Sequence, residues 1–393
     1  MSEWKKVKLG DIIEIKHGYA FSGEHIIEED NDIVLVTPGN FRIGGGFQEK
    51  KCKFFDGEIP QDYVLNGGDF IVTMTDLSKT IDTLGYSAYV PESNKRIYLH
   101  NQRIGLVSFK NDKCDRGYIY WLMRTHAYQR SIANTSTGST VHHTSPTKIY
   151  DYECFIPEKS TQHRIATILS RYDSLIENYQ KQIKLLEEAA QRLYKKWFVD
   201  LHFPGHENTK IIDGVPEGWE KKSVDSIYSI KYGKNLSTKL ITADGDYPVY
   251  GANGVIGYYD KANCNEQVVL ITSRGNGSGD VLMTYHKDAF ITNNSFIVIP
   301  LNEYDYCQLP FTYRFLNNAN FRSVRTGAAQ PQLTNQSIHT VDVVLPHKEL
   351  IVEYCKRTLK SNDVIIHLRN QIRLLTEARD RLLPKLMSGE IAV

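Results

Sequence analysis

QIKLLEEAAQRLYKK, at residues 182–196, returns as QIRLLTEARDRLLPK at residues 371–385. The two segments belong to a longer match, in which residues 138–198 align without a gap to residues 327–387 at an offset of about 189 positions. In register with them are Gly138/Gly327, Ile149/Ile338 and Pro157/Pro346. A duplication of this length predicts two structural repeats, each ending in a similar long helix.

A shorter match opens each half of the chain. Trp4, Ile12 and the run Ile15-Lys16-His17-Gly18 correspond to Trp219, Ile227 and the run Ile230-Lys231-Tyr232-Gly233. The middles of the two halves are not alike. Two similar scaffolds with dissimilar middles indicate a chain that recognises two different targets at a fixed separation.

The long helices carry an apolar seam whose members step by four and three residues alternately, which is the heptad pattern of a coiled coil. The first seam is Ile165, Leu169, Tyr172, Ile176, Tyr179, Ile183, Leu186, Ala190, Leu193 and Trp197. The second is Tyr354, Thr358, Ser361, Ile365, Leu368, Ile372, Leu375, Arg379, Leu382 and Leu386. The polar start of the second seam predicts weaker pairing there, or a different partner.

An amphipathic helix of this length must bury its apolar stripe. At ~37 residues it spans ~55 Å, which is longer than a domain of ~150 residues is wide. We therefore predict an intramolecular coiled coil between the two helices, in preference to each helix packing on its own domain. Antiparallel pairing would relate the two globular blocks by a pseudo-two-fold axis.

The globular blocks have the pattern of α+β domains, because short β-branched and aromatic runs alternate with Gly, Asn and Asp turns. Predicted strands are Ile33–Val36, Phe70–Thr73, Ile104–Phe109, Val268–Ile271, Phe290–Ile291 and Phe296–Ile299, with helical patches at Tyr118–Met123 and Phe311–Leu316. The predicted boundaries are globular blocks at 1–158 and 218–346, long helices at 159–203 and 347–393, and an exposed linker at 204–217. Pro204-Gly205 and Pro216-Glu217-Gly218 mark this linker.

The composition is that of a globular protein, with 41% apolar and 24% charged residues. No apolar run approaches the ~20 residues of a membrane span, and no apolar segment follows the N-terminus, so we expect a cytoplasmic protein. The six cysteines are scattered without a C-x-x-C pair. We expect them to be reduced and mostly buried.

The net charge is only +1, so any nucleic-acid surface must be local. No Asp or Glu lies between Asp115 and Asp151, or between Asp305 and Asp342. The cations in these windows are Arg116, Arg124, Arg130, Lys148, Arg314, Arg322 and Arg325, with His126, His142, His143 and His339. Two acid-free windows at equivalent places favour a surface that tolerates phosphate over a neutral loop packed on its own domain.

Catalytic motifs are absent from the sequence. There is no Pro-Pro dipeptide, so the Asn/Asp-Pro-Pro-aromatic motif of amino-methylating DNA methyltransferases cannot be present, and there is no G-x-x-x-x-G-K-[ST] phosphate loop. Residues 275–279 are glycine-rich but lie between strand-like runs, which favours a hairpin loop. His142-His143 lacks a third ligand, so we expect no metal site. The sequence therefore indicates a binding subunit rather than an enzyme.

The duplicated plan resembles the specificity subunit of type I restriction-modification systems over essentially the whole chain. Stretches that resemble its target-recognition domains are Val72–Lys79 with Asp82–Gly85, His100–Arg103, Thr137–Thr140, Thr272–Gly275, Thr292–Phe296 and Gly327–Pro331. The runs at Leu185–Glu187 and Leu374–Glu377 are similar to its spacer helices. The order of these stretches, rather than any one of them, carries the resemblance.

The resemblance implies that each of the two domains reads one part of a split DNA target and that antiparallel helices set the unread gap. It also implies two modification subunits that carry S-adenosylmethionine and methylate adenine, with motor-nuclease subunits that cut unmethylated DNA. This chain itself would bind no cofactor. A rod of ~55 Å covers at most ~16 bp at ~3.4 Å per step, so half-sites one helical turn apart are feasible and two turns are not.

Polar loop residues are the predicted DNA contacts, because Arg can bond guanine, Asn and Gln can bond adenine, and Lys, Ser and Thr can hold phosphates. For the first half-site they are Thr75, Asp76, Ser78, Lys79, Gly138, Ser139, Thr140 and His142. For the second they are Arg274, Asn276, Ser278, Arg322, Arg325, Gln330 and Gln332. Two alternatives remain open at this stage: a DNA-binding regulator that works alone, and a coiled-coil scaffold that does not bind DNA.

Overall fold

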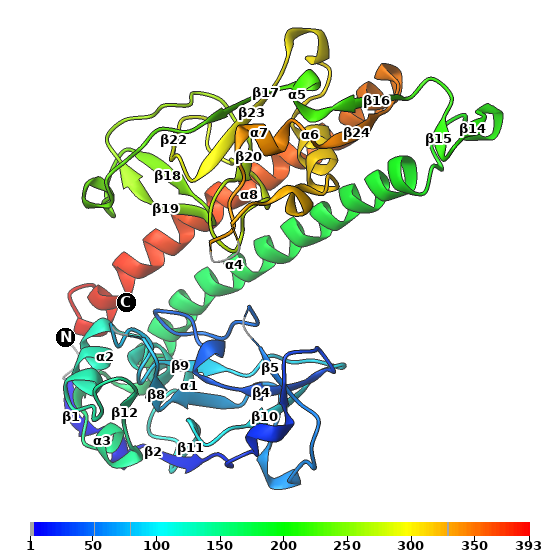
Figure 1. Cartoon of the computed structure of the whole chain (residues 1–393). Coiled ribbons are helices and arrows are strands. Elements are labelled where there is room, and N and C mark those ends of the chain that lie inside the picture. Colours follow the sequence, from blue (N-terminus) through cyan, green and yellow to red (C-terminus); the bar gives the residue numbers. More distant parts are fainter. Residues whose placement is uncertain (1–3, 51, 79, 328–329) are drawn as a thin grey trace. The chain divides into compact units, whose positions relative to one another are not determined.

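The computed structural model describes residues 4–50, 52–78, 80–327 and 330–393. The chain divides into two compact units (Figure 1). Unit 1 comprises Met1–Ile176 and Leu374–Val393, and unit 2 comprises Glu177–Arg373. Each unit thus holds one globular block, one part of the first long helix and one part of the second.

Unit 1 is built on two main sheets. The four-stranded sheet has the order β2 (Ile13–His17), β11 (Ile104–Phe109), β7 (Phe70–Thr73) and β9 (Ser87–Tyr89). The five-stranded sheet has the order β3 (Ile26–Ile27), β5 (Lys53–Phe55), β4 (Ile33–Val36), β10 (Ile97–His100) and β6 (Val64–Leu65). Two-stranded pairs join β1 (Lys5–Lys8) to β13 (Glu153–Ile156), and β8 (Thr75–Asp76) to β12 (His142–His143).

Three short helices complete the globular block of unit 1: α1 (Arg116–Leu122), α2 (His126–Asn134) and α3 (Pro146–Tyr150). Each begins at a polar N-cap residue whose side chain accepts a backbone N–H of the first turn, as Asp115 accepts from Tyr118. Their buried aromatic residues, including Tyr118, Trp121 and Tyr128, pack against the four-stranded sheet and the long helices.

Unit 2 repeats this plan with fewer strands. The four-stranded sheet has the order β17 (Tyr228–Tyr232), β23 (Ser295–Pro300), β20 (Val269–Thr272) and β21 (Val281–Met283). A three-stranded sheet has the order β19 (Gly254–Tyr259), β18 (Tyr247–Gly251) and β22 (Phe290–Ile291). The pair β16 (Glu220–Ser223) with β24 (Asp342–Leu345) corresponds to β1 with β13, and a small hairpin forms from β14 (Ile211–Ile212) and β15 (Val215–Pro216).

The helices of the globular block of unit 2 are α5 (Val224–Ile227), α6 (Leu309–Asn317) and α7 (Asn335–Ile338). An aromatic cluster at the end of the first long helix, with Tyr194 and Trp197, packs against Phe311 of α6 and Tyr354. Tyr354 is fully buried and donates its hydroxyl to the carbonyl of Ala190 (3.1 Å).

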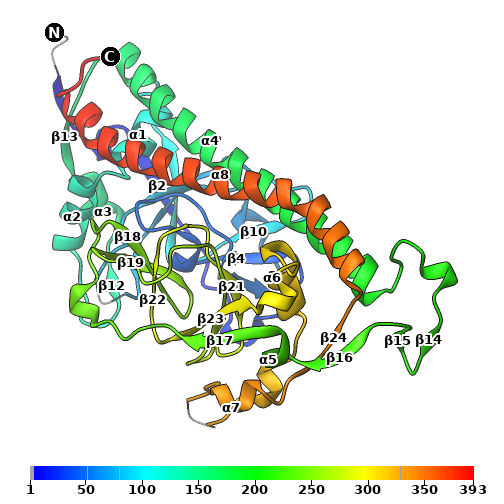
Figure 2. The ribbon, with the colours of Figure 1, turned by 90° about the horizontal axis from the view of Figure 1, so that it is seen from above.

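The two long helices are α4 (Lys159–Tyr194), which ends in a π-helical turn at Lys195–Val199, and α8 (Lys348–Ser388). In each unit a part of α4 lies beside a part of α8 and runs in the opposite direction (Figure 2). Ile183 meets Ile365 and Leu368 in unit 2, and Asp173 binds Arg379 in unit 1. The antiparallel coiled coil expected from the heptad pattern is therefore confirmed.

The seam residues have more neighbours than the sequence indicated. Ile165, Leu169 and Leu386 join the globular core of unit 1, and Trp197 joins that of unit 2. The stripe therefore serves both the partner helix and the domains, and among the described residues the cluster of Ile183, Ile365 and Leu368 is the one formed mainly between the two helices. The remaining seam residues Tyr172, Ile176, Tyr179, Leu186, Leu193, Ile372, Leu375 and Leu382 are buried or half-buried. Thr358, in the polar start of the second seam, is buried and bonds to the carbonyl of Tyr354.

The predicted strands and helical patches are present, with ends that shift by one or two residues. Residues 275–279 form a hairpin loop between β20 and β21, as expected. All six cysteines are free thiols, and all except Cys52 are buried. Within the described ranges no helix is both long and apolar enough to cross a membrane.

Candidate nucleic-acid interface

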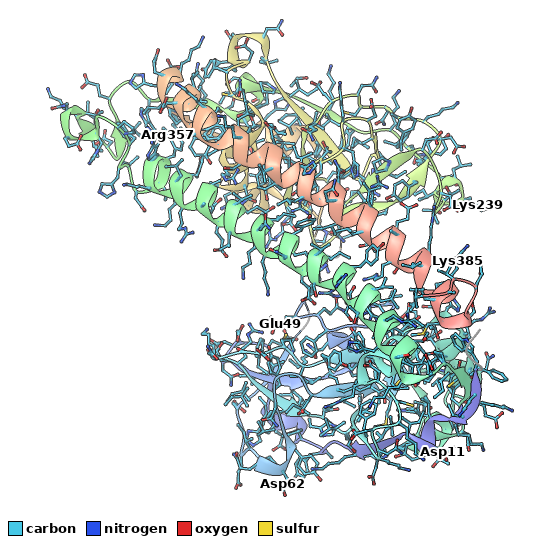
Figure 3. All side chains as sticks on the ribbon, turned by 180° about the vertical axis from the view of Figure 1, so that it is seen from behind. Asp11, Glu49, Asp62, Lys239, Arg357 and Lys385 are labelled. Atoms are coloured by element: carbon cyan, nitrogen blue, oxygen red, sulfur yellow. The ribbon has the colours of Figure 1, made fainter. Side chains whose placement is uncertain are left out.

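Three segments meet at the C-terminal end of one central strand of each four-stranded sheet, which is β7 in unit 1 and β20 in unit 2. Loop A follows this strand (residues 74–84 in unit 1, 273–278 in unit 2). Turn B leads into the neighbouring strand (residues 101–103 and 292–294), and loop C precedes the last short helix (residues 137–143 and 326–332). Figure 3 draws the side chains of the described residues of these segments, together with those of the rest of the described chain.

One residue joins the three segments in each unit. In unit 1 the N–H of Met74 donates to the carbonyl of Arg103 in turn B (2.9 Å), and its carbonyl accepts the N–H of Thr144, directly after loop C (3.0 Å). In unit 2 Ser273 makes the same two bonds, to Asn294 (2.8 Å) and from Leu333 (2.8 Å). The two units therefore present the same backbone frame.

Loop C is closed in both units by the same pair of backbone bonds. They join Thr137 to His143 and Thr326 to Gln332. A glycine follows each threonine, and both have positive φ (Gly138 +103°, Gly327 +85°). A Cβ at Gly138 would lie 2.0 Å from the carbonyl oxygen of Val141, so only glycine fits this turn.

Loop A of unit 1 is organised around the carboxylate of Asp76. One oxygen accepts the N–H of Ser78 (2.6 Å), and the other accepts the N–H and hydroxyl of Thr83 (2.6 and 2.7 Å) and the N–H of Leu84 (3.0 Å). Burial alone would raise the pKa of Asp76, but these hydrogen bonds outweigh it and hold the pKa below its usual value. Within the same loop Ile81 has φ +51°, a conformation that β-branched residues rarely adopt, and its carbonyl accepts the side-chain amide of Gln129 (2.5 Å).

We expect Asp76→Asn to loosen loop A. An amide keeps a single acceptor oxygen and turns an NH2 group toward N–H donors, and each buried donor left without a partner costs about 1–3 kcal/mol. Hydrogen exchange should show faster exchange of the Ser78, Thr83 and Leu84 amides. The matched control is Asp82→Asn, because the bonds seen for the Asp82 carboxylate within the described ranges come from the side-chain hydroxyls of Ser78 and Thr80 and from no backbone N–H. Unchanged protection of the three amides in Asp76→Asn would contradict this role.

Loop A of unit 2 is shorter and carries cations beside it. The guanidinium of Arg322 pairs with Asp280 (2.6 Å), and Arg325 donates to the carbonyls of Arg322 (3.2 Å) and Asn276 (3.4 Å). Arg274 is exposed, and no bond of its side chain is seen within the described ranges. The guanidinium groups of Arg322 and Arg325 thus have internal partners, whereas that of Arg274 is available to a ligand.

The predicted contact residues fall into three groups. Those at the surface are Gly138, Ser139, Thr140, Arg274, Asn276, Arg322, Gln330 and Gln332, and Ser78, His142 and Arg325 are half-buried. Thr75, Asp76 and Ser278 are buried, with 3%, 1% and 0% exposure. The prediction that these three side chains contact DNA directly is therefore wrong. Their polar atoms bond inside the loops, as Thr75 does with His143 (3.1 Å). Lys79 lies outside the described residues.

Two cations of the acid-free windows are interior residues rather than surface ones. Arg124 donates to Asp173 (2.6 Å), the carbonyl of Gly44 (2.8 Å) and the hydroxyl of Tyr120 (2.8 Å). Arg314 is buried in α6 and donates to the carbonyl of Pro310 (3.2 Å). The two windows therefore contribute less positive charge to the surface than a count of their cations indicates. Arg124 and Arg314 are buried, and Asp173, from outside the window, neutralises Arg124.

Turn B was not among the predicted contacts. Its residues lie within two of the stretches that resemble target-recognition domains, His100–Arg103 and Thr292–Phe296, and this resemblance is the signal that could have found it. Chemically, the three segments offer hydrogen-bond donors and acceptors, as nucleic-acid recognition requires. Among the described residues no group of three or more His, Cys, Asp or Glu side chains is placed to hold a metal ion.

Comparisons with known proteins agree with the duplicated plan of the chain. The sequence profile described as the type I restriction modification DNA specificity domain matches residues 1–188 and 216–374. The type I restriction enzyme MjaIX specificity subunit of Methanocaldococcus jannaschii is 28% identical over 303 residues, covering 70% of this chain and 69% of that protein. The HindI specificity subunit of Haemophilus influenzae is 22% identical, and the alignment covers 100% of both chains.

A similar fold occurs in the crystal structure of the type I restriction-modification S subunit from M. genitalium. The TM-score is 0.61 at 18% sequence identity, and the match covers 98% of this chain and 96% of the other. At this identity the likeness concerns the fold alone.

Proposed function

Because the chain belongs to the family of type I restriction-modification DNA specificity domains, we propose that it reads a two-part, gapped DNA target, with one half-site for each unit. It acts as the non-catalytic specificity subunit of a complex. Partner modification subunits bind S-adenosylmethionine and methylate adenine in the target, and motor-nuclease subunits of such a system cut DNA that lacks the methyl groups.

The observation that carries this proposal is the repeated frame with different side chains. Met74 and Ser273 hold three segments together by the same backbone bonds. The exposed side chains on this frame differ, for example Thr140 in unit 1 and Gln330 in unit 2. A common frame with different polar groups is what reading two different half-sites by base-edge contacts requires.

The helices support a complex with two modification subunits. Leu175 and Leu374 in unit 1, and Leu185 and Val364 in unit 2, are 42–59% exposed. Leu175 corresponds to Val364 in the duplication, and Leu185 to Leu374. Each unit therefore carries an equivalent pair of exposed apolar side chains on the two long helices, and two identical partners could bind by equivalent contacts.

The test is the methylation pattern made by the complex. We would express this chain with the modification subunit of its own system in a methylation-free host and sequence the DNA for N6-methyladenine. We expect one gapped motif in two parts, methylated on both strands. Methylation at an uninterrupted motif would overturn reading by two units. No methylation by an assembled complex would favour the regulator or scaffold alternatives, which tight specific binding by the chain alone would then distinguish.

A further inference from the structure

Resting on the proposed function, we propose that the last residue of turn B, Arg103 in unit 1 and Asn294 in unit 2, reads a base pair in the half-site of its own unit. Neither residue is among the individual contacts chosen from the sequence, although both lie in stretches that resemble target-recognition domains, His100–Arg103 and Thr292–Phe296. The proposal depends on the position of the two residues, on the rigidity of the turn and on the freedom of their side chains.

The turn has the same backbone bonds in both units. In unit 1 the N–H of Gln102 donates to the carbonyl of Tyr19 (2.9 Å), and the N–H of Ile104 donates to that of Asn101 (2.9 Å). In unit 2 the N–H of Asn293 donates to Lys234 (3.0 Å), and that of Ser295 to Thr292 (3.2 Å). With the bonds to Met74 and Ser273, Arg103 and Asn294 occupy equivalent positions.

A close backbone approach makes this turn rigid. In unit 1 the backbone just after β2 passes so near to the turn that a Cβ on Gly18 would lie 2.1 Å from the carbonyl oxygen of Asn101. In unit 2 a Cβ on Gly233 would lie 2.3 Å from the carbonyl oxygen of Thr292. Gly18 and Gly233 are equivalent residues in the short match that opens each half. Both halves of the sequence therefore keep the glycine that this close approach requires. A rigid support lets a side chain distinguish one base from another.

The first and last residues of the turn have different roles. Asn101 and Thr292 are buried at 7% and 4% exposure, and the side chain of Asn101 accepts the N–H of Arg103 (3.0 Å). Arg103 is exposed and Asn294 is half-buried, and within the described ranges neither side chain makes a hydrogen bond or ion pair. The first position therefore shapes the turn, and the last presents a free polar group beside loops A and C.

The two side chains suit different bases. The guanidinium fork of arginine matches N7 and O6 of guanine in the major groove, and the amide of asparagine matches N7 and N6 of adenine. A change from one to the other on an unchanged frame would alter which base is accepted without altering the fold. We therefore assign a preference for guanine to Arg103 and for adenine to Asn294.

The experiment uses the complete complex and reciprocal variants, Arg103→Asn and Asn294→Arg, each with methylome sequencing. We expect Arg103→Asn to change the preferred base at one position of one half-site and to leave the other half-site unchanged. Asn294→Arg should do the converse, so each variant is the control for the other. A good bidentate contact gives about 1–3 kcal/mol of discrimination, which is about 5- to 150-fold in relative methylation of the two sequences.

A third variant, Arg103→Lys, separates base reading from charge. Lysine keeps the positive charge but loses the fork, so we expect relaxed selection at the same single position. Uniformly lower methylation of all sites without a change in motif would indicate a phosphate contact and overturn the proposal. An unchanged motif in both reciprocal variants, or loss of all methylation by an assembled complex, would also overturn it. Failure of the proposed function is distinguishable, because the wild-type complex would then lack a two-part motif.

Discussion

Replacing Asp173 with alanine is expected to lower the stability of unit 1 by about 3–5 kcal/mol, which corresponds to a melting temperature about 6–20 °C lower. The carboxylate lies between two arginines, with Oδ2 2.6 Å from Arg124 and Oδ1 2.5 Å from Arg379. Arg124 has only 4% side-chain exposure and Arg379 only 14%. Without the carboxylate, the buried guanidinium of Arg124 loses its anionic partner, and that of Arg379 keeps only Asp380 (2.7 Å).

The same triad ties the globular block of unit 1 to both long helices. Arg124 lies in the turn between α1 and α2, Asp173 on α4 and Arg379 on α8. Arg124 also stacks on Trp121 (4.2 Å from the ring centre), whose indole N–H donates to Ser170 of α4 (3.0 Å). Loss of the carboxylate should therefore loosen the attachment of the block to the helices.

Calorimetry of the whole chain, with hydrogen exchange to locate the change in unit 1, measures this effect. The matched control is Glu177→Ala, an exposed acid on the same helix for which no ion pair is seen within the described ranges, and it should change stability by less than about 0.5 kcal/mol. Asp173→Ala with Arg379→Ala should cost less than the sum of the two single variants, because the two side chains contact each other directly and each single change removes the same contact. A cost below about 1 kcal/mol for Asp173→Ala would contradict a desolvated network.

The pH dependence follows from the same geometry. Burial would raise the pKa of Asp173, but Arg124 and Arg379 outweigh it and hold the pKa below its ordinary value. A lowered pKa in the folded state means that the stabilisation is complete above the unfolded value of about 3.9 and is lost as the pH falls through the folded value. The stability difference between wild type and Asp173→Ala should therefore be constant above pH 5 and shrink below about pH 4.

Periodic and local features of the fold could be predicted from the sequence. Ile183 and Leu368 are seam residues because a heptad pattern depends only on spacing along one helix, and Ile33–Val36 is a strand because its β-branched side chains favour one. Long-range partners could not be predicted. Nothing near Arg124 in the sequence indicates that Asp173, 49 residues later, supplies its counter-ion. The cations were therefore counted as surface charge.

The site was predicted only in part for a similar reason. Loops A and C were chosen from their polar composition, but composition does not show which side of a loop faces inward. Asp76 is the interior support of loop A, and Thr75 bonds to His143. Turn B lies in stretches that resemble target-recognition domains in the sequence, but only the bonds of Met74 and Ser273 showed that it meets loops A and C at one point. The interpretation of the chain as a specificity subunit with two recognition domains does not depend on these details, because it follows from the duplication in the sequence.

The largest expected effect on assembly comes from the exposed apolar pair of unit 1. If the proposed complex with two modification subunits uses these pairs, Leu175→Glu with Leu374→Glu should weaken the binding of one of them by about 10²–10³-fold, since each buried anchor of an interface contributes about 2 kcal/mol or more. Native mass spectrometry should then show a complex with one modification subunit in place of two. Both residues are exposed in the chain alone, so its melting temperature should hardly change.

The control for this variant is Ser174→Glu with Ala378→Glu, which adds the same charges at exposed positions of the same two helices without removing an apolar side chain. It separates loss of apolar contact from repulsion by the added carboxylates. Unit 2 keeps Leu185 and Val364, so one partner should still bind with its original affinity. If each modification subunit serves one half-site, methylation should persist on one strand of the target only. Binding of two modification subunits with unchanged affinity would show that the partners use another surface, because these equivalent pairs are then not part of the interface.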